Sequence, residues 1–89
     1  MTIDDLADDL EVPLLRIDPA EVYDAAIIGY ARYRGATVLV YDQDLVIAQT
    51  VKHDGMSYED AVDWHEFNTF DAWLGEGTPV FVRRVRHDP

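Results

Sequence analysis

The sequence predicts one small α+β domain, with about four helices packed on a small sheet of two main strands. Three observations support this class. Helix-capping signals recur along the chain, two short β-branched runs are typical of strands, and 89 residues suffice for only one domain. The expected order is α-α-β-α-α-β. Two strands alone are marginally stable, so they need helices on at least one face or a partner chain that extends the sheet.

The composition favours a folded domain despite the short length. A chain of this size buries only about 60–65% of its unfolded surface. Two tryptophans, five tyrosines and three phenylalanines supply large rings for the core. The sequence contains no cysteine, which excludes disulfides, thiolate metal sites and cysteine nucleophiles.

The first 17 residues predict an acidic helix followed by an extended segment. Thr2 begins the helix as its cap, and Pro13 ends it. The next helix begins at Asp18-Pro19-Ala20-Glu21, where Asp18 caps and Pro19 takes the first helical position. It is expected to run to about Arg34, just before a glycine suited to ending a helix.

The first strand is expected from Thr37 to Tyr41, a short apolar run with two valines. The next run, Leu45 to Val51, is ambiguous. Its β-branched residues favour a strand. Asp42 as a cap and Asp54-Gly55 as a stop favour a helix. We predict the helix, mainly because of a resemblance described below.

A second clear helix start lies at Ser57, which caps, with Asp60 at the reciprocal position. This helix should run to about Phe67 or Asn68, and Thr69 is expected to cap a further short turn. The second strand is expected from Thr78 to Val85, as a candidate edge for pairing with another chain. Residues 86–89 are expected to form a frayed tail.

The formal charge of −11 restricts the classes of partner. Phosphates would be repelled from most of the surface, which disfavours direct binding of nucleic acid or of a membrane surface. Partners with basic surfaces are favoured by electrostatic steering. The alternative is that the charge only keeps the protein soluble. The basic cluster Arg83, Arg84, Arg86 and His87 is expected to offset the protein's own acids.

The N-terminus lacks the basic and apolar regions of a signal peptide, and no apolar run approaches the roughly 20 residues of a membrane span. We therefore expect a cytoplasmic protein. We also expect no cofactor and no metal site, because the histidines and acids lack the spacing of a metal motif.

One cluster could serve an enzyme, namely Asp63, His65 and Glu66. Each helical residue turns about 100°, so His65 points away from Asp63 and shares a side with Ala61 and Val62. We expect a core histidine there and no catalytic residue. An enzyme that uses these three groups stays open as an alternative, ranked after the two binding hypotheses given below.

Two acidic helix faces are the candidate binding surfaces. One comprises Asp4, Asp5, Asp8 and Asp9; the other comprises Glu59, Asp63 and Glu66. A row of carboxylates along a helix can imitate a phosphate backbone, whose charges lie about 1.7 Å apart along a duplex axis. A host protein that handles nucleic acid is then a natural target. Trp64 or Trp73 would add an apolar anchor if exposed.

The C-terminal half resembles a set of short phage and prokaryotic proteins of uncharacterised function. The similarity rests on three segments and on a weaker lead-in over Val38 to Tyr41. The segments are Asp54-Gly55-Met56-Ser57-Tyr58-Glu59-Asp60-Ala61, Glu66-Phe67-Asn68 and Trp73-Leu74-Gly75-Glu76-Gly77-Thr78-Pro79-Val80-Phe81. The resemblance implies a helix at Leu45 to His53. It also implies a phage-like context, in which small acidic proteins often interfere with host enzymes or defence systems.

The leading hypothesis is thus a non-enzymatic protein that binds a host macromolecule with a basic surface, as an inhibitor or counter-defence protein. The second is a small-molecule or nucleotide binder, monomeric or dimeric, with its pocket near Glu66, Asn68 and the stretch from Gly75 to Thr78.

Overall fold

The computed structural model describes residues 14–70 and 77–85. The predicted N-terminal helix with Asp4, Asp5, Asp8 and Asp9, the residue Trp73, and the C-terminal tail lie outside these ranges. Within them the order is α2 (Ala20–Tyr23), a 3₁₀ turn (Asp24–Ala26), β1 (Ile27–Tyr33), β2 (Ala36–Asp42), α3 (Gln43–Asp54), α4 (Tyr58–His65), a π-helical turn (Glu66–Phe70) and β3 (Val80–Val82).

The predicted fold class is wrong in its details. The described residues form three α-helices and a three-stranded mixed sheet, not four helices on two strands. The main difference lies in the helix expected from Asp18 to Arg34. It lasts for one α-helical turn and one 3₁₀ turn, and the chain then continues as strand β1. Asp18 does not cap this helix, because Pro19 is the N-cap residue and makes no side-chain capping bond.

A tight hairpin explains why β1 is a strand. Tyr33 pairs with Ala36, so only Arg34 and Gly35 connect the strands. Both have positive φ angles, 53° and 81°, as a type I′ turn requires. Ile27, Ile28, Tyr30 and Tyr33 also belong to residue types that strands favour. The glycine expected to end a helix therefore belongs to a β-turn.

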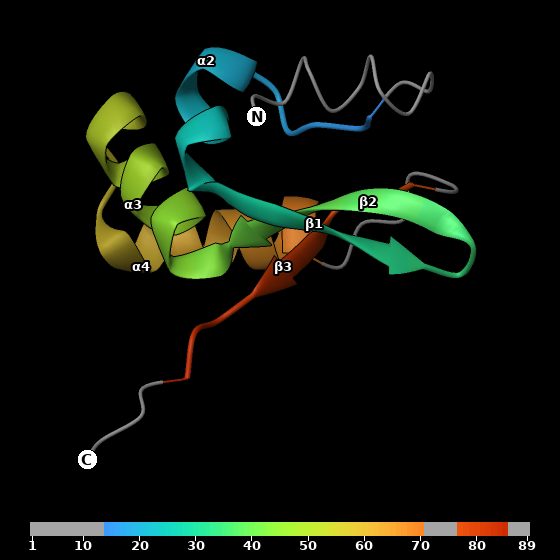
Figure 1. Cartoon of the computed structure of the whole chain (residues 1–89). Coiled ribbons are helices and arrows are strands. Elements are labelled where there is room, and N and C mark those ends of the chain that lie inside the picture. Colours follow the sequence, from blue (N-terminus) through green and yellow to red (C-terminus); the bar gives the residue numbers. More distant parts are fainter. Residues whose placement is uncertain (1–13, 71–76, 86–89) are drawn as a thin grey trace.

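The sheet has the order β1-β2-β3, with β1 antiparallel and β3 parallel to β2. β2 contains the predicted strand Thr37 to Tyr41 and extends it by one residue at each end. β3 lies inside the predicted Thr78 to Val85 but has only three residues. The hairpin projects away from α2 and α3, so its turn lies at the far end of the molecule (Figure 1).

Helices α3 and α4 begin where the capping signals predict. Asp42 Oδ1 accepts a hydrogen bond from the Leu45 amide, and Ser57 Oγ accepts one from the Asp60 amide. α3 ends at Gly55, whose φ is 70°. The ambiguous run from Leu45 to Val51 is thus a helix. Thr69 does not cap a new turn, because it lies inside a π-helical continuation of α4; the rest of the turn expected after it, from residue 71 onward, lies outside the described residues.

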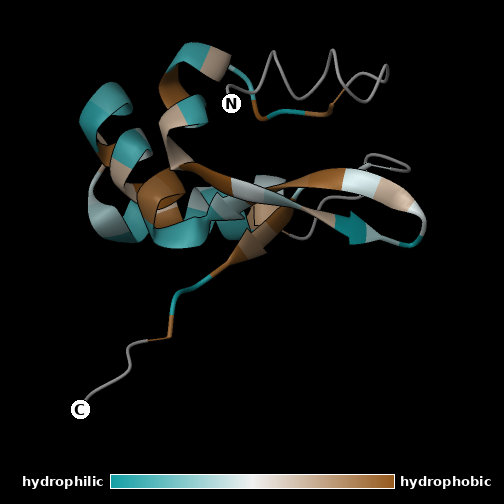
Figure 2. Cartoon of the chain, viewed as in Figure 1, coloured by the Kyte–Doolittle hydropathy of each residue, from teal (hydrophilic) through white to brown (hydrophobic). Residues whose placement is uncertain are grey.

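The core lies between β2 and the helices. Its buried members are Tyr23, Ala26, Leu39, Tyr41 and Val46. The predicted extended segment around Leu14 and Ile17 packs against this cluster, and the Ile17 amide donates to the Tyr41 hydroxyl at 2.9 Å. Apolar residues follow β2 and the beginning of β1, while the end of β1 and much of the outer helical surface are hydrophilic (Figure 2).

Candidate functional site

Helix α4 has an inner side that is buried and an outer side that is exposed. Ala61 and His65 are buried at 0% and 1% exposure, as the sequence predicts for residues four apart on one side. Trp64 is 52% exposed, and Phe67 in the following π-helical turn is 90% exposed. The same short segment therefore contributes to the core and presents two large aromatic side chains to solvent.

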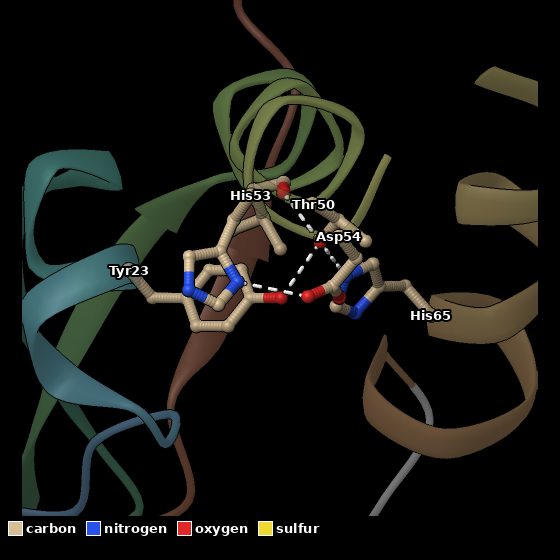
Figure 3. A network of polar contacts seen from close by, with 6 residues as sticks. Tyr23, Thr50, His53, Asp54 and His65 are labelled. Carbon is tan, nitrogen blue, oxygen red and sulfur yellow. Dashed lines mark hydrogen bonds and ion pairs between the residues drawn. The ribbon is translucent and has the colours of Figure 1, made fainter. Parts of the chain in front are cut away.

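The inner side is held by a buried polar network. Thr50 Oγ1 lies 2.7 Å from the Tyr23 hydroxyl and 2.5 Å from His65 Nε2. His65 Nδ1 lies 2.9 Å from Thr69 Oγ1. Figure 3 shows Tyr23, Thr50 and His65 converging from α2, α3 and α4. The network thus joins the three helices through side chains that would be costly to bury unpaired.

The hydroxyl of Thr50 also donates to the Val46 carbonyl, at 3.1 Å. With its single proton directed there, Thr50 Oγ1 accepts from both Tyr23 and His65 Nε2. His65 Nδ1 then accepts from the Thr69 hydroxyl. Burial lowers the pKa of His65, and the negative charge of Asp54 opposes this only partly. The imidazole is therefore neutral at pH 7.

Two rings also enclose His65. Tyr23 meets it edge to face with ring centroids 5.8 Å apart, and Phe70 stacks on it at 5.4 Å. Phe70 in turn contacts Phe81 of β3, with centroids 5.0 Å apart. This aromatic row ties the π-helical turn to the sheet and so fixes the direction in which the outer side of α4 faces.

The outer side forms an open groove of about 460 Å³. Its lining residues all come from α4 and its two flanks: Met56, Asp60, Asp63, Trp64, Phe67 and Asn68. The Asn68 side-chain amide donates to the Trp64 carbonyl at 2.9 Å, which fixes the start of the π-helical turn. The groove thus combines an apolar aromatic floor with two carboxylates.

The structure places part of the predicted binding set in this groove. Asp63 and Trp64 line it, and Trp64 is exposed, as the predicted apolar anchor requires. Glu59 and Glu66 are exposed on the same segment but do not line the groove. The other predicted residues, Asp4, Asp5, Asp8, Asp9 and Trp73, lie outside the described residues.

Sequence reasoning missed Met56, Asp60 and Phe67 as members of this surface. The signal was present in the spacing, because residues 60, 64 and 67 follow the i, i+4, i+7 pattern of one helix face. On that face large aromatic residues alternate with acids, whereas the opposite side carries Ala61 and His65. An aromatic side chain beside exposed acids on a helix is the pattern that would have indicated the groove.

The structure does not bring Asp63, His65 and Glu66 together. Both nitrogens of His65 are engaged by threonine hydroxyls, and the two acids are exposed. In the described part of the chain, no group of three or more histidines and acids could hold a metal ion. Nor is any helix described there long and apolar enough to cross a membrane.

Two arginines of the basic C-terminal cluster pair with the protein's own acids, as predicted. Arg84 Nε lies 2.8 Å from Asp42 Oδ2, and Arg83 Nε lies 3.4 Å from Asp44 Oδ1. These pairs neutralise charge at the beginning of α3. The remaining members, Arg86 and His87, lie outside the described residues.

A second, half-enclosed pocket of about 220 Å³ lies between the segment before α2, the π-helical turn and the segment leading into β3. Its lining residues are Arg16, Ile17, Asp18, Asn68, Thr69, Thr78, Pro79 and Phe81. Asn68 and Thr78 belong to the region predicted for a small-molecule pocket. Glu66 does not line it.

Comparison of the chain with protein-family models, with curated proteins and with solved structures finds no match. The phage-like context implied by the resemblance therefore stays a prediction. The function has to be argued from the site alone.

Proposed function

We propose that the protein acts by non-covalent binding, and that its groove on α4 captures an arginine- or lysine-bearing segment of another protein. The observation that supports this most directly is the exposure of Trp64 and Phe67 beside Asp60 and Asp63. Exposed aromatic side chains gathered in one groove are typical of binding surfaces.

The chemistry of the groove selects a basic occupant. An arginine side chain can lay its aliphatic stem and guanidinium plane on Trp64 or Phe67, while its charge meets the carboxylates of Asp60 and Asp63. Cation–π contacts contribute about 0.5–1 kcal/mol at exposed sites and more when water is excluded. The net charge of −11 adds long-range attraction and a faster association rate.

Glu59, Asp63 and Glu66 support a narrower form of the proposal. All three are exposed along α4 and the turn after it, so they present a row of negative charge. A host protein whose basic surface normally holds nucleic acid fits such a row, and occupying that surface would inhibit it. No catalytic step and no cofactor enter this proposal.

The test compares captured proteins between variants, because recovery of a protein from a lysate alone supports nothing specific. Tagged wild-type protein, Trp64→Ala, Phe67→Ala and Tyr58→Ala are incubated with lysate of the presumed host after nuclease treatment. Tyr58 is the matched control, because it is an equally exposed aromatic residue of α4 outside the groove.

The proposal predicts one basic protein that is retained by the wild type and by Tyr58→Ala. It should be lost from the two groove variants and released at high salt. Asp60→Asn with Asp63→Asn should also weaken binding, whereas Glu21→Gln on α2 should not. Equal retention by Trp64→Ala and the wild type would overturn the proposal.

The pocket beside Thr69 supports a second candidate function, the binding of a small polar molecule. Its lining combines the polar residues Asp18, Asn68 and Thr78 and the arginine Arg16, which pairs with Asp24 at 3.3 Å, with an apolar floor. A thermal-shift screen of nucleotides and small acids tests it. A stabilising compound whose effect disappears in Asp18→Asn and persists in Phe67→Ala would favour this site over the groove, because Asp18 lines only this pocket and Phe67 lines only the groove.

A further inference from the structure

Strand β1 is an edge strand of the sheet that the described residues form. Among the described residues it pairs only with β2, and it runs over seven residues without a proline, a lysine or an acid. Such edges invite pairing with another strand unless charges, prolines or shortness protect them. The opposite edge, β3, is protected in this way, because it has three residues and follows Pro79.

The regular part of this edge is short and has a definite centre. The register with β2 shifts between Ile27 and Gly29, which marks a bulge at Ile28. The remaining segment runs from Gly29 to Tyr33 and is centred on Ala31. Tyr33 and Ala36 pair directly beside the turn. Because the hydrogen-bonding direction of successive residues alternates in an antiparallel ladder, the backbone N–H and C=O groups of Tyr30 and Arg32 point away from β2.

We propose that two copies of this chain pair antiparallel through β1, around a two-fold axis at Ala31, to form one continuous six-stranded sheet. This arrangement pairs all five residues of the regular segment. It places Gly29 opposite Tyr33 of the second copy on one face, and Tyr30 opposite Arg32 of the second copy on the other. The axis generates each contact twice.

The contact at Gly29 accounts for two features that the single chain leaves unexplained. A Cβ atom placed on Gly29 meets nothing within 4 Å, so the space above this residue is open. Glycine also weakens a strand. Tyr33 is 47% exposed on the same face, although the Arg34 guanidinium lies 5.4 Å from the centre of its ring, and an aromatic ring across from a strand glycine covers the bare backbone of that glycine.

The contact on the other face of the sheet, between Tyr30 and Arg32 of the second copy, pairs two chemically compatible side chains. Tyr30 is 56% exposed, and an arginine directly opposite can place its guanidinium on the ring. Charge favours a second copy here over other regions of the molecule. Residues 25–41 contain no acid and two arginines, so two chains of charge −11 can meet along this stretch without opposing carboxylates.

The proposed dimer interface does not involve the groove of α4, so dimer formation can be tested separately from binding at the groove. Sedimentation equilibrium over a range of concentrations measures the dimer dissociation constant of the full chain and of two variants at one position. Tyr30→Arg places two like charges opposite each other twice and should weaken the dimer about tenfold or more. Tyr30→Glu places an acid opposite Arg32 twice and should leave the dimer intact.

The two variants separate local pairing from overall charge. Tyr30→Arg reduces the net negative charge of each chain, so general repulsion alone predicts a tighter dimer for it and a weaker one for Tyr30→Glu. The proposal predicts the reverse order. It is overturned if the wild type is a monomer throughout, if neither variant changes the constant, or if Tyr30→Glu dissociates the dimer and Tyr30→Arg does not.

Discussion

The two sides of α4 differ in what their residues contact. On the inner side, His65 is bonded to Thr50 and Thr69, and Tyr23 and Phe70 flank its ring. On the outer side, Trp64 and Phe67 lie in solvent beside two carboxylates. The same segment, α4 and the π-helical turn after it, therefore contributes buried side chains to the core on one side and leaves aromatic side chains accessible on the other.

Because the buried contacts of the inner side and the groove on the outer side involve different side chains, substitutions can test the stability of the core and the proposed binding separately. The inner groups are satisfied by one another, so removal of one leaves others unpaired in the core. The outer aromatic side chains gain little from the fold, so their removal should change stability little. The following predictions run from the largest expected change in the free energy of unfolding to the smallest.

Thr50→Val should cause the largest decrease in the free energy of unfolding. Valine keeps the shape but removes the hydroxyl that serves both Tyr23 and His65, and each group left unpaired costs about 1–3 kcal/mol. We expect a decrease of about 2–4 kcal/mol in urea unfolding. Thr50→Ser, which retains the hydroxyl, should lose about 1 kcal/mol. Equal losses in the two variants would show that the network contributes nothing.

Acidification should destabilise the protein through the same network. The pKa of His65 is lowered by burial, so between its folded value and the ordinary 6.5 the unfolded chain binds more protons. Stability is therefore full above pH 6.5 and decreases as the pH falls below it. Unfolding measured from pH 7.5 downward should show this decrease in the wild type.

His65→Gln should flatten that pH dependence at a lower overall stability. The matched control is His53→Gln, since His53 is an exposed histidine on α3 that pairs only with the neighbouring Asp54 among the described groups. A pH dependence in His65→Gln as steep as in the wild type would assign the effect to other groups.

Phe67→Ala should show the smallest change, within about 0.5 kcal/mol of the wild type, because its side chain is 90% exposed. Trp64 is 52% exposed, so Trp64→Ala should cost somewhat more, about 1 kcal/mol, through the apolar surface that the ring buries. Urea unfolding monitored by circular dichroism measures this for both variants. A loss above about 2 kcal/mol, typical of a buried aromatic, would contradict the exposed placement.

Local capping signals predicted α3 and α4 well. Asp42 and Ser57 make the hydrogen bonds expected of them, and a cap acts within one turn, so a sequence can reveal it. The prediction of a helix up to Arg34 was wrong because the start signal at Asp18-Pro19 acts only on the first turn. The strand that follows forms by pairing with β2, which is distant in sequence from that signal.

The turn at Arg34-Gly35 also lacked the Asn-Gly or Asp-Gly signature that announces such hairpins. The strand predicted at Thr78 to Val85 does lie at an edge of the sheet, as β3, but the longer edge strand is β1, which the sequence did not reveal. Pairing between distant strands is a tertiary property, and propensity within one segment does not reveal it.

The candidate site was half predictable. Helical spacing placed His65 inward with Ala61, and Asp63 on the acidic side, before any coordinates. Periodicity could not reveal that Thr50 and Thr69 engage both nitrogens of His65, because these contacts depend on how α3 and α4 pack.

The proposal that the outer side of α4 recognises a basic segment makes a direct prediction about the groove residues. The most direct measurement is an NMR titration of the ¹⁵N-labelled protein with a short arginine-rich peptide, in which backbone and indole shifts are followed. The account predicts shifts concentrated at Met56, Asp60, Trp64, Phe67 and Asn68, absent in Phe67→Ala and reduced by salt. Shifts spread evenly over exposed acids, or confined to residues outside this groove, would contradict it.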